Sequence, residues 1–201
     1  MDEKKILVLA SNNQGKLREF QAMFSDAGVE VINQGALGVP SCPEPYETFV
    51  ENCLAKARHA AKIPGKPAMA DDSGVCVDAL GGLPGVHSAR FAGEPKSDAA
   101  NNALLVEKLA HESNRRAHYT CVLVAVRSAE DPEPLVADGR WFGEIHDTPA
   151  GEGGFGYDPY FYVPEAGKTA AEMSAEEKNR VSHRGQALVK LRAKIREVWG
   201  W

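Results

Sequence analysis

Residues 67–74 read PAMADDSG, in which a short apolar stretch, Pro67 to Ala70, leads directly into Asp71, Asp72, Ser73 and Gly74. We predict a parallel strand that stops in the carboxylate pair and a glycine turn, at the sheet edge where α/β proteins bind ligands. Two adjacent carboxylates there offer the hard oxygen ligands that divalent cations prefer. The alternative is an ordinary acidic turn, because Asp and Gly dominate turns for conformational reasons alone.

Outward from this segment, the chain alternates between predicted strands and helices. Further strands are predicted at Lys5–Ala10, Val29–Ile32, Val75–Leu80, Tyr119–Val126 and Leu135–Ile145, with Tyr119–Val126 as the central strand. Helices are predicted after the cap Asn13 as far as Gly28, from the T-x-x-E pattern at Thr48 to Lys62, over Ser97–His111, and over Ser182–Val198. This order indicates an α/β protein with a mixed central sheet flanked by helices.

Length and composition limit the class of protein. A chain of 201 residues fits one domain, 1–201, with a substantial core. A net charge of −5 argues against nucleic acid as a partner, since binding a phosphate backbone needs a basic surface. We expect no membrane partner and a cytoplasmic protein, because no apolar run reaches transmembrane length and the charged start, Met1 to Lys5, is not followed by a signal-peptide stretch. The cysteines lack metal-site spacing and are expected to be reduced and mostly buried.

The segment Ser11, Asn12, Asn13, Gln14, Gly15 and Lys16 joins the first predicted strand to the first helix. Free N–H groups at a helix start, a glycine and a lysine together form a phosphate cradle. The segment is not a P-loop, because Ala10 stands where that motif needs Gly and Leu17 where it needs Ser or Thr. A capped helix start with a solvated lysine is the alternative.

A second group of polar residues contains Glu44, with Glu47 close by, and Asn52 and Lys56 one helical turn apart. Together with Asp71 and Asp72, these residues are predicted to place carboxylates around a cation and a lysine near phosphate. The alternative is a solvated acidic loop followed by an exposed polar helix face.

Two further groups lie near the C-terminal end. The segment 153–159 reads GGFGYDP, with two aromatic residues among its glycines. Glycines let the backbone approach a ligand, an aromatic ring can stack on a base, and Asp158 can accept hydrogen bonds or hold an arginine. Lys178 and the SHRG segment at 182–185 supply donors suited to a base carbonyl or a phosphate. A glycine-rich hairpin and a capped basic helix are the alternatives.

In their order and spelling, these segments resemble the inosine/xanthosine triphosphate pyrophosphatase family over essentially the whole chain. The resemblance is carried by the stretches 11–16 (SNNQGK), 70–74 (ADDSG), 83–85 (LPG), 88–90 (SAR), 153–158 (GGFGYD) and 182–185 (SHRG). It implies a two-lobed α/β fold with a cleft between the lobes, usually a homodimer. It also implies Mg²⁺-dependent hydrolysis of non-standard purine nucleoside triphosphates (ITP, dITP, XTP) to nucleoside monophosphate and pyrophosphate, which cleanses the nucleotide pool.

The same resemblance assigns roles to residues. Asp72 matches the proton acceptor and a metal ligand, and Glu44 matches the second metal carboxylate. The matched substrate contacts are Ser11, Asn12, Asn13, Gln14, Gly15, Lys16, Ser73, Phe155, Gly156, Tyr157, Asp158, Lys178, His183 and Arg184. From the chemistry of the residues, Lys16 and Lys56 are predicted to stabilise transition-state charge, and His183 and Arg184 to donate to O6 of the base. We predict a crowded 2-position that rejects guanine.

The chain also departs from the family pattern. Pro45 and Tyr46 follow Glu44 where the family commonly has Thr-Gly, so Glu47 competes for the metal role. His87 and Phe91 stand where Tyr is frequent, which bears on the lining of the 88–90 segment. Two other functions remain open: a related pyrophosphatase for modified pyrimidine or 7-methylguanine nucleotides, which should lack the SHRG segment in this form, and a non-catalytic nucleotide sensor, which should have lost a metal carboxylate.

Overall fold

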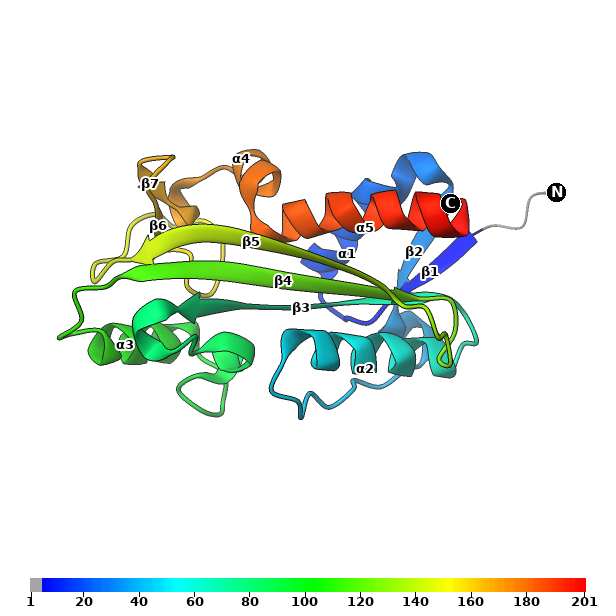
Figure 1. Ribbon diagram of the computed structural model, residues 1–201, viewed down its shortest axis with the longest axis horizontal. Helices are drawn as coiled ribbons and strands as arrows, with labels where there is room; N and C mark the ends of the chain where they lie inside the picture. Colours follow the sequence, from blue (N-terminus) through cyan, green and yellow to red (C-terminus); the bar gives the residue numbers. More distant parts are fainter. Residues whose placement is uncertain (1–4) are drawn as a thin grey trace. The chain divides into compact units, whose positions relative to one another are not determined.

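The computed structural model describes residues 5–201, so residues 1–4 of the charged start considered above lie outside the described part of the chain. A mixed seven-stranded sheet has the order β2-β1-β3-β4-β5-β6-β7 (Figure 1). Its strands are β1 Lys5–Leu9, β2 Val29–Asn33, β3 Ala68–Val77, β4 Arg116–Val126, β5 Leu135–Ile145, β6 Phe161–Val163 and β7 Lys168–Thr169. β1 pairs in parallel with β2 and β3, and β6 pairs antiparallel with β5 and β7. The predicted α/β class, the mixed sheet and the central place of β4 are confirmed.

The chain divides into two compact units. Unit 1 consists of Met1–Asp72, Val122–Asp138 and Ala187–Trp201, and unit 2 of Ser73–Cys121 and Gly139–Gln186. The single domain over residues 1–201 and the cleft between two lobes stay predictions.

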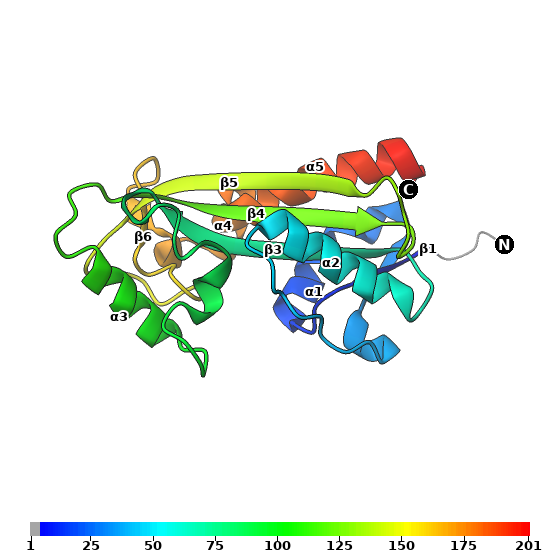
Figure 2. The same cartoon turned by 60° about the horizontal axis from the view of Figure 1, so that its bottom comes forward.

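Helices cover both faces of the sheet in unit 1. These are α1 Gln14–Phe24, α2 Phe49–Lys62 and the part of α5 His183–Trp199 that starts at Ala187. Small residues of α2, among them Cys53 and Ala57, pack on Val8, Ala70 and Val124. α1 and α5 lie on the opposite face from α2, where an ion pair joins Arg192 to Asp26 just after α1 (Figures 1 and 2). The alternation of side chains along β1 explains this, because Val8 faces one layer while Leu7 and Leu9 face the other.

Side-chain caps begin the helices where the sequence predicts them. Asn13 Oδ1 accepts the Lys16 N–H at 3.0 Å, Thr48 Oγ1 accepts the Glu51 N–H at 3.3 Å, and Ser97 Oγ accepts the Ala100 N–H at 3.2 Å. These bonds satisfy N–H groups that a helix start otherwise leaves without a partner. α1 ends at Phe24, and a short 3₁₀ turn, η1 Ser25–Ala27, then reaches Gly28, whose φ of 65° suits a helix C-cap.

Unit 2 has a separate apolar core. Leu105 and Leu109 of the α3 region (α3 is Asp98–Lys108) pack with Tyr119, Trp141 and Phe161, which come from β4, β5 and β6. A short helix, α4 Ala175–Val181, precedes α5. It was not predicted from the sequence, although the capping box of Ser174 and Glu177 is a signal for a helix start. The predicted helix from Ser182 is confirmed as α5, with Ser182 Oγ accepting the Gly185 N–H at 3.2 Å. The short β6 and β7 were also missed.

One expectation about the fold is wrong. The strand does not stop at the carboxylate pair, because β3 continues from Ala68 to Val77 through Asp71, Asp72 and Gly74. The separate strand predicted over Val75–Leu80 is therefore the end of β3 followed by a 3₁₀ turn, η3 Asp78–Leu80. Pairing with β1 ends at Met69, while β4 remains the neighbour of β3 on its other side. Asp71 and Asp72 thus follow the last β3 residues that pair with β1, but β3 continues beyond them beside β4.

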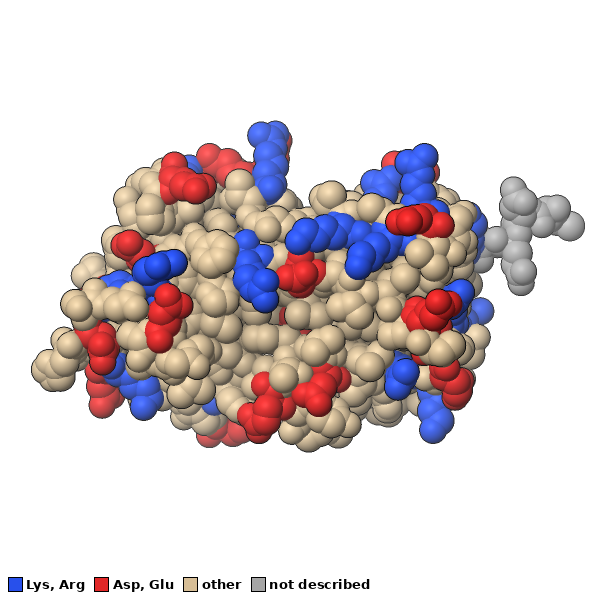
Figure 3. All heavy atoms as spheres, in the orientation of Figure 1, with Lys and Arg blue, Asp and Glu red and all other residues tan. Residues whose placement is uncertain are grey.

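The surface in Figure 3 carries charges of both signs, and the cysteines are free thiols. Acidic and basic side chains are interspersed on the face in Figure 3, and a group of Lys and Arg side chains lies over α5. No disulfide joins the four cysteines, all of which are within the described residues; Cys53 and Cys121 are buried, and Cys42 and Cys76 are half-buried. Over residues 5–201, no helix combines the length and apolarity needed to cross a membrane.

Candidate active site

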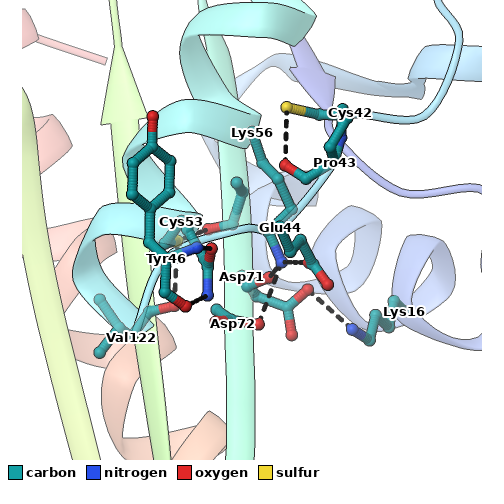
Figure 4. Close-up of polar contacts among 12 residues, drawn as sticks. Lys16, Cys42, Pro43, Glu44, Tyr46, Cys53, Lys56, Asp71, Asp72 and Val122 are labelled. Carbon is teal, nitrogen blue, oxygen red and sulfur yellow. Dashed lines mark hydrogen bonds and ion pairs between the residues drawn. The ribbon is translucent and has the colours of Figure 1, made fainter. Parts of the chain in front are cut away.

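A cluster of carboxylates and lysines lies on unit 1 where β3, α2, the first turn of α1 and the loop that carries Glu44 meet (Figure 4). Lys56 Nζ, from α2, donates to a carboxylate oxygen of Glu44, to Asp72 Oδ1 at 3.1 Å and to the Asp71 carbonyl oxygen at 2.7 Å. Lys16 Nζ donates to Asp71 Oδ1 at 2.9 Å. The sheet alternates Asp71 and Asp72 to opposite faces, so each carboxylate meets a different lysine. The structure therefore brings together the predicted Glu44, Lys56, Asp72 and Lys16.

Burial sets the charge behaviour of this cluster. Burial raises the pKa of Asp72 to about 6, with the Lys56 ammonium opposing this effect and the Glu44 carboxylate adding to it. Burial also works against the charge of Lys56, but Asp72, Asp71 and Glu44 together raise its pKa above the ordinary value. Lys56 is thus a permanent cation, whereas Asp72 exchanges a proton near neutral pH.

One oxygen in the cluster is left for a ligand. Asp72 Oδ2 is buried and has no hydrogen-bond partner among residues 5–201. A buried carboxylate oxygen without a partner is costly, and a bound cation or a hydrogen-bond donor from a ligand relieves that cost.

The loop that carries Glu44 is held by Asn52. This buried side chain accepts the Tyr46 N–H and donates to the Tyr46 carbonyl oxygen, both at 3.0 Å. Glu44 is half-buried at Lys56, whereas Glu47 is exposed. The polar face shared by Asn52 and Lys56 is therefore no solvated stripe: one residue anchors the loop and the other contacts its carboxylate.

The segment 11–16 forms the start of α1 as predicted. Ser11 Oγ accepts the Asn13 N–H at 3.1 Å, and Asn12 Oδ1 accepts the Gly35 N–H at 3.0 Å. A Cβ on Gly35 would lie 2.5 Å from Asn12 Oδ1, so this glycine permits the close approach. Gln14 and Gly15 stand in the first helical turn, whose N–H groups attract anions.

In unit 2 the glycine-rich segment is a loop anchored by Asp158, a buried residue. Asp158 Oδ2 accepts the Phe155 N–H at 2.9 Å and a hydrogen bond from Lys178 Nζ, and Asp158 Oδ1 accepts the Tyr119 hydroxyl at 3.1 Å. Phe155 is exposed, and Lys178 Nζ lies 4.9 Å from its ring centroid. The predicted residues Phe155, Asp158 and Lys178 therefore contact one another.

A cavity of about 150 Å³ in unit 2 lies beside this loop. Its lining comprises Ser73, Gly74, Val75, Ser88, Ala89, Asp98, Tyr119, Phe155, Gly156, Tyr157 and His183. Of the two predicted base contacts, His183 lines the cavity, while Arg184, also buried, does not. Ser73 Oγ is buried without a hydrogen-bond partner among the described residues, and Ser73 directly follows Asp72 in β3.

Several residues of this arrangement were not among the predicted site residues. Asp98 Oδ2 accepts the Gly156 N–H at 2.8 Å, and Asn102 Nδ2 donates to the Gly156 carbonyl oxygen at 2.9 Å. The Tyr157 hydroxyl donates to the Ser88 carbonyl oxygen at 2.6 Å. In the sequence, Asp98 is indistinguishable from an acidic residue in a first helical turn, and Tyr119 from a core residue in an apolar strand. Only their tertiary neighbours reveal their place.

The model of the Ham1 family matches residues 7–194. The chain belongs to the Ham1 family. The matched range contains both the carboxylate–lysine cluster and the cavity of unit 2, so membership extends to the elements that carry these residues.

Relatives in the Ham1 family are similar over almost their whole length. A protein of Chromobacterium violaceum named dITP/XTP pyrophosphatase is 67% identical over 192 residues, which cover 96% of this chain and 98% of the relative. A protein of the same name from Neisseria meningitidis serogroup B is 58% identical over 197 residues, covering 97% and 99%. A solved structure of a HAM1 protein from Coxiella burnetii has a TM-score of 0.93 and 46% identity, covering 96% of this chain and all of that one. The resemblance inferred from the motifs is confirmed.

Proposed function

We propose that this chain hydrolyses ITP, dITP and XTP to the nucleoside monophosphate and pyrophosphate, by Mg²⁺-assisted attack of water on the α-phosphorus. The observation that carries the proposal is the carboxylate–lysine cluster of unit 1. In this cluster, Asp72 Oδ2 has no hydrogen-bond partner among the described residues. Family members 58–67% identical are named dITP/XTP pyrophosphatase, which supports the same substrate class here.

The residues fit a magnesium ion shared with substrate. Mg²⁺ is usually held by one or two carboxylates, with substrate phosphates and water completing its shell. Glu44 and Asp72 supply such a pair, and residues 5–201 contain no group of three or more His, Cys, Asp or Glu that would form a complete protein cage. When bound, the ion would neutralise phosphate charge and act as a Lewis acid at the phosphoryl oxygens.

The chain's own groups provide the remaining chemistry. Above its pKa of about 6, the Asp72 carboxylate accepts a proton from the attacking water. A bond forms between the water oxygen and the α-phosphorus, the bond from that phosphorus to the bridging oxygen breaks, and pyrophosphate leaves. Lys16, Lys56 and the first-turn N–H groups of α1 stabilise the developing negative charge. Asp72 then releases its proton to solvent.

The cavity of unit 2 is proposed to take the purine base. Phe155 would stack on it, and His183 with neighbouring N–H groups would donate to O6, whereas Arg184, predicted for the same role, is buried but does not line the cavity. Adenine presents an amino group at that position, which is itself a donor and cannot accept these hydrogen bonds. Crowding at position 2 is not sufficient to exclude guanine, because xanthine carries an oxo group of similar size there, so the expected rejection of guanosine triphosphate is tested directly.

The deciding experiment measures pyrophosphate release from inosine, xanthosine, adenosine and guanosine triphosphates with and without Mg²⁺. We expect release from the first two only, dependent on Mg²⁺, and reduced by about 10²–10⁴-fold in Asp72→Asn because the proton acceptor is lost. Binding of ITP without product would indicate a sensor. Release from all four substrates would refute the argument that the site recognises O6 of the base. Rapid turnover of guanosine triphosphate would refute the prediction that the 2-position is crowded.

A matched pair of variants separates the two candidate metal carboxylates. Glu44→Gln should raise the Mg²⁺ concentration needed for half-maximal activity, because it removes one of the two paired carboxylates, whereas the exposed Glu47→Gln should leave it unchanged. The reverse result would transfer the metal role to Glu47.

Turnover of modified pyrimidine or 7-methylguanine nucleotides in preference to ITP would favour the related pyrophosphatase.

The proposal includes a homodimer in the cytoplasm, with no nucleic acid or membrane partner. The homodimer is supported by the family resemblance and by large apolar side chains left exposed on unit 2. Phe142 is 61% exposed and Val181 43% exposed, and both border a cavity of about 550 Å³. Exposed apolar surface of this kind marks interaction sites more often than isolated side chains do.

A further inference from the structure

Tyr119 joins two groups that the proposed function assigns to the base. It is a β4 residue, nearly buried, and its ring stacks on the His183 imidazole with centroids 4.7 Å apart and planes inclined by 9°. Its hydroxyl donates to Asp158 Oδ1 at 3.1 Å. One side chain on a rigid strand therefore contacts both the first residue of α5 and the anchor of the glycine-rich loop.

Asp158 transmits this contact to the loop. Its Oδ2 accepts the Phe155 N–H, and Phe155 lines the cavity. The packing is tight, because a Cβ on Gly154 would lie 2.1 Å from Asp158 Oδ2. A carboxylate with a donor on each oxygen has little rotational freedom, so the Tyr119 hydroxyl helps to set where Phe155 enters the cavity.

The stack restrains His183 in the same way. Phe161 supports the Tyr119 ring from the core, with centroids 4.6 Å apart, and Trp141 lies 6.5 Å from the imidazole at an interplanar angle of 14°. Burial and the nearby Asp158 carboxylate raise the pKa of the Tyr119 hydroxyl, which therefore remains a donor. Aromatic stacking fixes the plane of the imidazole and hence the direction of its N–H groups.

We propose that Tyr119 is a positioning residue for base selection, orienting His183 through its ring and Phe155 through Asp158. This inference rests on the proposed function, because it presumes that the cavity of unit 2 takes the base. Tyr119 touches the purine recognition groups from behind and does not take part in the chemistry at phosphorus. Its loss should therefore affect substrate binding and discrimination more than turnover.

The test uses Tyr119→Phe, which keeps the ring and removes only the hydroxyl. We expect the KM for ITP to rise about tenfold, as for loss of a hydrogen bond to a charged group, with kcat changed less than about twofold. The ratio of kcat/KM for ITP over ATP should fall. The matched control is Tyr162→Phe. The Tyr162 ring stacks on His146, with ring centroids 4.3 Å apart and an interplanar angle of 17°, and Tyr162 does not line the cavity. This variant should therefore behave as wild type.

Other outcomes are distinct. An unchanged KM, or equal losses on ITP and ATP, would reduce Tyr119 to a core residue and overturn the inference. If wild-type protein itself released no pyrophosphate, the proposed function would fail first. A variant-independent measurement uses NMR of wild-type protein titrated with inosine monophosphate: His183 ring protons should shift while their NOEs to the Tyr119 ring persist, and NOEs that vanish on binding would refute the positioning role.

Discussion

Asp72 and Asp131 show how the same side chain acquires opposite chemistry within unit 1. Burial dominates at Asp72 and raises its pKa to about 6. At Asp131, hydrogen bonds from the Arg127 side chain, together with the N–H groups of Arg127 and Glu133, outweigh burial and lower the pKa to about 2. The first aspartate can exchange protons near neutral pH, and the second stabilises structure as an anion at neutral pH.

Asp131 makes stability depend on acid. Because its folded pKa lies below the ordinary value of 3.8, the stabilisation is complete above that value and is lost as pH falls toward 2. Asp131→Asn should lower the free energy of unfolding at pH 7 by about 1–2 kcal/mol, a figure reduced for the exposed Arg127 guanidinium. Urea unfolding at pH 7 and pH 2.5 measures this, and the difference between the two proteins should shrink at the lower pH.

The control is Asp147→Asn, which removes an exposed ion pair with Arg115 and should change the unfolding free energy by less than about 0.5 kcal/mol. A pH-independent effect of Asp131→Asn would show that packing rather than ionisation explains the loss.

At the scale of elements, one helix organises the loop that carries Glu44. α2 presents Asn52 and Lys56 one turn apart, and the first holds the Tyr46 backbone while the second contacts Glu44. The loop departs from the family pattern at Pro45 and Tyr46, yet this double hydrogen bond to backbone atoms does not depend on the side chain at position 46. The departure is therefore compatible with Glu44 reaching the cluster.

Asn52→Ala should free this loop. Because Asn52 is buried and makes two hydrogen bonds, we expect a loss of about 1–3 kcal/mol in stability and a higher Mg²⁺ requirement for ITP hydrolysis as Glu44 becomes mobile. Val50→Ala, at an exposed position on the same helix, is the matched control and should change neither quantity. If Asn52→Ala lost stability but kept the wild-type Mg²⁺ dependence, Asn52 would be structural only.

At the scale of the whole molecule, the assembly can be measured directly. We expect light scattering to give a mass about twice the 21.7 kDa of one chain, because the family resemblance implies a homodimer and unit 2 exposes Phe142 beside a cavity. A dilution series distinguishes a stable dimer from weak association. A mass of one chain at every concentration would contradict the homodimer.

Much of the fold follows from local signals in the sequence. The caps Asn13 and Thr48 begin their helices as predicted, the helix predicted from Ser97 starts at that residue, and β5 has the predicted bounds, Leu135–Ile145. Such features depend on residues within a few positions of one another, since a cap or an apolar period acts over one or two turns. The chemical groups of the site were predicted for the same reason: each occurs as a compact segment whose residue types indicate phosphate, metal or base.

The tertiary structure alone decided how these segments are used. The Asp and Gly residues at 71–74 predict a turn locally, but a neighbouring strand keeps β3 extended to Val77, since pairing outweighs weak local preference. Likewise Asp98, Asn52 and Tyr119 carry ordinary local signals, and their roles come from partners 58, 6 and 39 positions away, Gly156, Tyr46 and Asp158. The sequence by itself thus determined the helices, the sheet class and the chemistry available, whereas the continuity of β3 and the set of residues around each group depended on contacts that only the folded chain makes.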